Sequence, residues 1–91
     1  MKKINNLDGK VSVVIGAGRG IARAIAIGFA GAGSAICCAA RTGKEIENTL
    51  SEIKKQGGKG IAVKTDITRI ESVENMIKTA TRDLGAPIFL L

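Results

Sequence analysis

The chain has 91 residues, which is enough for one small domain and too few for two. Hydrophobic residues make up 45% of the sequence and recur at regular spacing, which excludes a disordered chain. No uninterrupted apolar run approaches the ~20 residues that a membrane-spanning helix needs. The formal charge of +6 raises the question of nucleic acid, but basic and acidic residues alternate along the chain and only Phe29 and Phe89 are aromatic. A nucleic-acid partner is therefore the least favoured interpretation.

The amino-terminal stretch MKKINNLDGK carries lysines with no apolar segment behind them, which does not resemble a secretory signal. Cys37 and Cys38 are adjacent, and neighbouring strand residues point to opposite faces, so we do not expect them to pair with each other. With no histidine and no Cys-x-x-Cys spacing, a zinc site has no ligands. These features favour small core cysteines and a cytoplasmic location.

The first predicted unit is a strand, a glycine turn and a helix. Residues 11–15 are mostly β-branched, which is typical of a strand buried on both faces. Gly16, Gly18 and Gly20 then permit a sharp turn and a close approach to a bound group. A helix is predicted from Gly20 or Ile21, with Ile21, Ile25 and Phe29 along one side and alanines between them. Such a helix start points unpaired amides at the turn, which favours an anion such as a pyrophosphate.

The remaining chain continues the alternation of strands and helices. Strands are predicted at 34–40, 60–64 and 88–91, and glycines end each helix between them. Thr42 with Glu45, and Thr68 with Glu71, have the spacing of capping boxes, so we expect a helix to begin at each. Apolar stripes are predicted on these two helices, formed by Ile46, Leu50 and Ile53 on one and by Val73, Ile77 and Leu84 on the other. This order predicts an α/β fold with a parallel sheet, the first part of a Rossmann-type doubly wound domain over residues 1–91.

The glycine turn does not have the Gly-x-Gly-x-x-Gly spacing, because Ile21 stands at the third glycine position. Its pattern Gly16-x-x-x-Gly20-Ile21-Ala22 resembles the Thr-Gly-x-x-x-Gly-Ile-Gly motif of the short-chain dehydrogenase/reductase family. The resemblance covers nearly the whole chain. It includes the segments LDGK at 7–10, Ala40-Arg41, TDIT at 65–68 and LGAPI at 84–88. Ile15 and Ala22 replace a threonine and a glycine of the motif, so we expect altered loop geometry with binding retained.

The resemblance implies a dinucleotide cofactor and hydride transfer between nicotinamide and a carbonyl or alcohol carbon. The end of the second strand selects NADP over NAD. An NAD site of this type places an acid there, whereas this sequence has Ala40-Arg41 with no acid nearby. A guanidinium matches a 2′-phosphate, and Arg19 could add a second charge. Family resemblance further implies that Asp66 binds the adenine amino group, with Ile67 beside the ring. The implied cofactor-binding residues are Gly16, Gly18, Arg19, Gly20, Ile21, Arg41, Asp66 and Ile67.

No catalytic residue is predicted in this chain. The family uses a serine, a tyrosine and a lysine of a Tyr-x-x-x-Lys motif, and this sequence contains no tyrosine. We expect an amino-terminal portion of a reductase, from a truncated or frameshifted reading, that is inactive alone. A small-molecule substrate is then expected only in a full-length relative. Two alternatives stay open, a nucleotide-binding module without turnover and a basic partner-binding protein. An uncovered fourth strand predicts self-association.

Overall fold

The computed structural model describes residues 6–91, so the first half of the stretch judged not to be a secretory signal lies outside the described residues. Strands and helices alternate as predicted, and most boundaries agree within two residues. In chain order they are β1 (Val11–Ile15), α1 (Gly20–Gly31), β2 (Ala35–Ala40), α2 (Gly43–Lys55), β3 (Lys59–Lys64), α3 (Ile70–Asp83) and β4 (Phe89–Leu90). None of the helices within residues 6–91 has the length and apolar character needed to cross a membrane.

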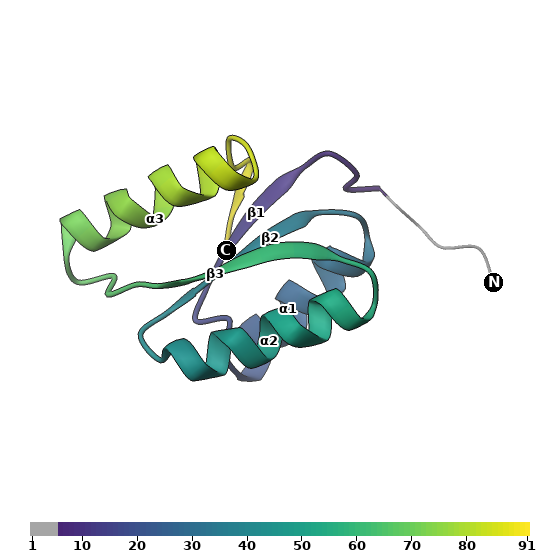
Figure 1. Ribbon diagram of the computed structural model, residues 1–91, viewed down its shortest axis with the longest axis horizontal. Helices are drawn as coiled ribbons and strands as arrows, with labels where there is room; N and C mark the ends of the chain where they lie inside the picture. The colour runs from purple at the N-terminus through teal and green to yellow at the C-terminus, as the bar shows by residue number, and fades with distance from the viewer. Residues whose placement is uncertain (1–5) are drawn as a thin grey trace.

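All four strands run parallel in one sheet of order β3-β2-β1-β4 (Figure 1). Each crossover from β1 to β2 and from β2 to β3 moves the chain one strand toward the same edge, and β4 then pairs on the other side of β1. This reversal of direction is the switch point at which open α/β sheets hold their ligands, outside the carboxyl ends of the strands. The predicted Rossmann-type parallel arrangement is confirmed.

Helices cover both faces of the sheet, with α1 and α2 on one side and α3 on the other (Figure 1). Alternate strand residues supply the two cores. Val14 and Cys38 pack with α1 and α2, whereas Val13 and Cys37 pack with Met76 of α3. The two cysteines are fully buried on opposite faces, as predicted.

The buried side of α1 differs from the predicted stripe. Ile21 is 81% exposed, and the fully or nearly buried residues are Ala26 and Ala30. Small side chains face the sheet because they allow the helix backbone to lie close to the strands, which leaves the larger isoleucine at the helix start in solvent. The predicted helix is confirmed, but Ile21, which the periodicity places on the same side as Ile25 and Phe29, faces solvent.

The predicted capping boxes do not form. Thr42 does precede α2, but it makes no side-chain capping hydrogen bond. Helix α3 begins at Ile70 with Arg69 at the cap position, one residue later than the predicted cap at Thr68. Thr68 instead donates its hydroxyl to Asp66 Oδ1 at 2.6 Å and its amide to the same oxygen at 3.0 Å. This local turn around an aspartate competes with the cap and delays the helix.

Candidate functional site

The carboxyl ends of β1, β2 and β3 come together around a pocket of about 290 Å³. Each strand contributes the residue at its end or just beyond it, because parallel strands finish at the same edge. The start of α2 closes the pocket on one side. The lining residues are Ile15, Gly16, Gly18, Arg19, Ala40, Arg41, Thr42, Glu45, Thr65 and Ile67.

The glycine turn uses its first and last glycines for backbone conformation. Gly16 and Gly20 have φ values of +73° and +66°, in the left-handed region that side chains with a Cβ rarely adopt. The Gly16 amide donates to the Ala39 carbonyl at 2.7 Å, which ties the turn to the end of β2. Helix α1 then begins at Gly20 with no acid in its first turn and no side-chain cap from Arg19. Its first amides are thus available to an anion.

Gly18 is needed for space. An ideal Cβ on Gly18 would lie 2.7 Å from Glu45 Cβ, so a larger residue there would force α2 away from the turn. The same helix holds the turn from beneath, because the buried Thr49 hydroxyl donates to the Ala17 carbonyl at 2.8 Å. The sequence predicted close approach to a ligand at Gly18, and the structure adds close approach to α2.

An acid stands in this pocket, which corrects the expectation of none near Arg41. Glu45 Oε1 lies 3.8 Å from Arg19 Nε, with side-chain exposures of 37% and 84%. The sequence did not reveal this role, because the spacing of Glu45 from Thr42 predicts a capping box. The contact with Arg19 joins residues 26 positions apart in the chain. Because α2 begins directly after the end of β2, its first turn lies at the same edge as the glycine turn, and this order of elements was the available signal. Arg41 itself is exposed and forms no ion pair within residues 6–91.

Asp66 and Ile67 occupy the turn after β3. Hydrogen bonds from the Thr68 hydroxyl and amide lower the pKa of Asp66 below its usual range, and the charges of Arg41 and Arg69 add to this effect. The Asp66 amide in turn donates to Ser72 Oγ at 2.8 Å. The side chain of Ile67 is 58% exposed and lines the pocket. An ionised carboxylate and an apolar surface are thus presented side by side.

Not every predicted residue lines this one pocket. Gly16, Gly18, Arg19, Arg41 and Ile67 do, whereas Gly20 and Ile21 lie just beyond it, at the start of α1. Asp66 lines a neighbouring hollow of about 470 Å³, which shares Arg41 and Thr65 with the pocket and adds Lys64 and Ser72. Arg41 therefore stands between the two hollows. The candidate site is a continuous strip along the carboxyl edge of the sheet.

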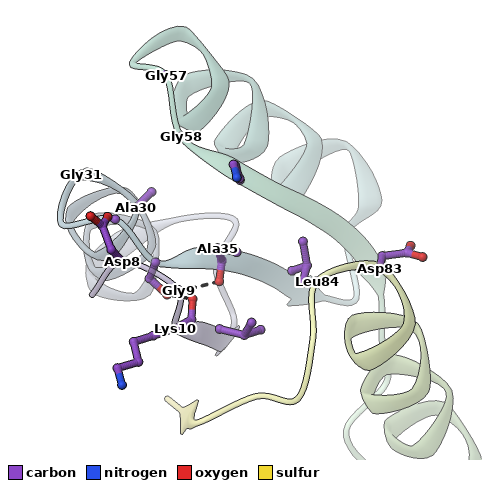
Figure 2. Close-up of a pocket in the computed structure, with 14 residues that line it drawn as sticks. Asp8, Gly9, Lys10, Ala30, Gly31, Ala35, Gly57, Gly58, Asp83 and Leu84 are labelled. Atoms are coloured by element: carbon purple, nitrogen blue, oxygen red, sulfur yellow. Dashed lines mark hydrogen bonds between the residues drawn. The ribbon is translucent and has the colours of Figure 1, made fainter. Parts of the chain in front are cut away.

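A larger hollow of about 510 Å³ lies at the opposite, amino edge (Figure 2). The carboxyl-terminal ends of the three helices surround it, at Gly31, Gly57 and Asp83. Helix ends of this polarity present carbonyl oxygens, which repel an anion. The charges of Asp8 and Asp83 offset those of Lys10 and Lys59, and Lys10 extends away from the other labelled residues (Figure 2). This hollow does not have the chemistry of a phosphate site.

The sequence profile of the family described as short chain dehydrogenase matches residues 10–90. A short chain dehydrogenase from Pseudocercospora fijiensis is 34% identical over 93% of this chain. A hydroxynaphthalene reductase-like protein from Metarhizium robertsii is 36% identical over 88% of this chain. The chain spans 27% and 30% of the length of these two relatives.

Solved structures give the same result. A hydroxysteroid dehydrogenase from Escherichia coli superposes with a TM-score of 0.90 and 33% identity, over 92% of this chain and 34% of that one. The citronellol catabolism dehydrogenase of Pseudomonas aeruginosa superposes with a TM-score of 0.91 and 27% identity, over 99% of this chain and 38% of that one. Proteins of this family bind NAD or NADP. By its sequence and by its fold, this chain belongs to the short-chain dehydrogenase family.

Proposed function

We propose that this chain is the cofactor-binding portion, residues 1–91, of an NADP-dependent short-chain oxidoreductase. The observation that carries the proposal is the meeting of Arg19 and Arg41 with the glycine turn in one pocket at the carboxyl edge. The cofactor would supply hydride chemistry, and the whole protein would pass a hydride between nicotinamide and a carbonyl or alcohol substrate. This chain would bind and orient the adenosine and pyrophosphate parts.

Each proposed contact follows from the chemistry of a residue. Backbone amides of the turn and of the α1 start, from Gly16 to Ile21, would hold the pyrophosphate. The Arg41 and Arg19 guanidinium groups would bind the 2′-phosphate, since a guanidinium donates parallel hydrogen bonds to phosphate oxygens. The ionised Asp66 would accept from the adenine amino group, and Ile67 would cover the ring. The pocket and its neighbour adjoin at Arg41 and Thr65, so the proposed phosphate and adenine contacts lie along one edge of the sheet.

Titration with NADPH and NADH tests the cofactor preference. Replacing Arg41→Ala is expected to weaken NADPH binding about tenfold to a hundredfold, which corresponds to the roughly 1.5–3 kcal/mol of a charge-assisted hydrogen bond. NADH binding is expected to change little, because it lacks the 2′-phosphate. Lys59→Ala, at the amino edge, is the matched control that removes the same charge far from the site. Equal losses for both cofactors would contradict the role of Arg41.

Two alternatives have their own tests. A nucleotide-binding module without turnover would bind NADPH equally well, so the coding sequence past Leu91 decides between them. Asn-Asn-Ala-Gly and Tyr-x-x-x-Lys in any frame would favour the oxidoreductase. A basic nucleic-acid-binding protein would bind generic DNA with steep salt dependence. Absence of DNA binding at low salt would remove it.

Assembly and location are further parts of the proposal. Strand β4 lies at the sheet edge, and Ile88, Leu90 and Leu91 are 59%, 67% and 45% exposed. An apolar edge strand favours pairing with another chain, so the isolated chain should self-associate. Sedimentation as a clean monomer would contradict this. Two free buried thiols fit a reducing compartment such as the cytoplasm.

A further inference from the structure

Glu45 places a carboxylate in the pocket where the proposed function places a phosphate. We propose that Glu45 is a specificity-determining residue that holds Arg19 in the cofactor-free protein and opposes the 2′-phosphate of NADP. The inference rests on the proposed function, because it assigns the pocket of Arg19 and Arg41 to that phosphate. The preference for NADP or NAD would then depend on the attraction of Arg19 and Arg41 for the phosphate and on its repulsion by Glu45, since all three line the same pocket.

The backbone of Glu45 is fixed against the glycine turn. The next residue, Ile46, is 1% exposed in the core beneath α2. One turn further on, the fully buried Thr49 hydroxyl is shared between the Ala17 carbonyl at 2.8 Å and the Glu45 carbonyl at 3.2 Å. A Cβ built on Gly18 would lie 2.7 Å from Glu45 Cβ, so the turn and α2 are close at this point. The burial of Ile46 and Thr49 opposes a large movement of α2, so rotation of the side chain is the easiest way to take this carboxylate out of the pocket.

The Glu45 ion pair is weak enough to exchange. Its atoms are 3.8 Å apart and the Arg19 side chain is 84% exposed, so water and salt screen the attraction. A phosphate carries about −1.5 to −2 charges and three acceptor oxygens, so it competes well for the guanidinium. The displaced carboxylate then remains beside a group of the same sign. A ribose 2′-hydroxyl does not meet this repulsion, because it is neutral and can donate to a carboxylate.

Neutralising Glu45 in the full chain tests the inference. Glu45→Gln is expected to tighten NADPH binding about threefold to tenfold, a range set by screened charge pairs at a surface, and to leave NADH binding unchanged or weaker. Glu47→Gln is the matched control, because this exposed acid lies on the same helix and outside the pocket. Its NADPH affinity should stay within about twofold of the wild-type value. Fluorescence titration with each cofactor, at low and at physiological ionic strength, gives four dissociation constants for each protein.

A second variant separates the effect of the carboxylate on NADPH binding from its effect on the stability of α2. Glu45→Asp keeps the negative charge that favours a helix start and shortens the side chain by one methylene, so NADPH binding should tighten by about two- to threefold. If the wild type prefers NADPH and neither variant shifts the NADPH-to-NADH ratio, the inference is wrong and the proposed function stands. If neither the wild type nor any variant binds either cofactor, the proposed function and the inference both fail. A larger effect of Glu45→Gln at low salt supports the inference.

Discussion

The two edges of the sheet differ in chemistry more than in size. The hollow at the amino edge is the larger, at about 510 Å³ against about 290 Å³ for the pocket at the carboxyl edge. The helices end at the amino edge, where they present unpaired carbonyl oxygens. They begin at the carboxyl edge, where they present unpaired amides. The polarity of the backbone therefore favours an anion at the carboxyl edge, although the hollow at the amino edge is the larger.

Glycines at both edges serve backbone conformation and close packing, so the edges differ in what lies beside these glycines. At the amino edge, Gly33 and Gly57 adopt left-handed backbone conformations, and Gly58 leaves room for the core, because a Cβ there would lie 2.8 Å from Ile53 Cγ2. At the carboxyl edge, Gly16 and Gly20 adopt left-handed backbone conformations, and Gly18 leaves room for Glu45. We infer that substitutions at the amino edge affect stability alone, whereas those at the carboxyl edge also affect cofactor binding. Three substitutions test this difference, and a treatment at alkaline pH, which destabilises both edges together, comes before them.

Alkaline pH should have the largest effect and should not distinguish the edges. Burial raises the pKa of Cys37 to about 11, and burial with the nearby Cys37 and Glu47 raises that of Cys38 to about 12. The folded chain thus retains thiol protons that the unfolded chain releases above about pH 9, so stability is constant below that pH and falls above it. The expected loss by pH 10 is about 2–3 kcal/mol for the two thiols together.

Urea unfolding at pH 8 and at pH 10 measures this loss. The double variant Cys37→Ala, Cys38→Ala should be less stable at pH 8, through its smaller side chains, but should lose less between the two pH values. If the free energy of unfolding falls with pH as steeply in the variant as in the wild type, groups other than the two thiols cause the alkaline transition.

Gly58→Ala should have the next largest effect and should test the amino edge. The added methyl group would press on the fully buried Ile53, at its Cγ2 and at its carbonyl 3.0 Å away. Overpacking of this kind costs about 1–3 kcal/mol. NADPH affinity, measured where the variant is fully folded, should match that of the wild type. A large loss of NADPH affinity in the folded variant would contradict the inference that substitutions at the amino edge affect stability alone.

Thr49→Val should test the attachment of the glycine turn to α2. Valine has nearly the same shape, but it cannot donate to the buried Ala17 carbonyl, which costs about 1–2 kcal/mol. Thr79→Val is the matched control, because the exposed Thr79 hydroxyl donates to the Asn75 carbonyl of its own helix. Unfolding by urea should show little change in that control. Similar losses in both variants would mean that the bond to Ala17 has no special role.

Gly18→Ala should cost the least stability, about 1 kcal/mol, because the first turn of α2 lies at the surface and can shift. Its NADPH affinity should nevertheless fall severalfold, since the turn and α2 can no longer approach as closely. Gly43→Ala is the control at the start of the same helix, where a Cβ meets nothing within 4 Å. That control should retain affinity and gain about 0.4–1 kcal/mol of stability. Calorimetric titration and thermal unfolding measure both quantities.

Much of the fold was predictable from local sequence. Every strand and helix was predicted near its observed position, because buried β-branched runs and glycine stops are local signals. The capping boxes at Thr42 and Thr68 were not formed, since a side chain with the right spacing can bond elsewhere, as Thr68 does to Asp66. The exposed Ile21 shows a similar limit, because periodicity does not say which helix side meets the sheet.

Sequence alone determined the order of strands and helices, the glycine turn and the family to which the chain belongs. These features depend on neighbouring residues and on a motif of fixed spacing. Only the tertiary structure brought Glu45 to Arg19, joined Thr49 to the Ala17 carbonyl and placed Arg41 between two hollows. Such contacts depend on how α2 packs against the turn, and packing joins residues that are far apart in the chain. The physical reason is that short-range propensities fix the elements, whereas the charges within a site are set by long-range contacts.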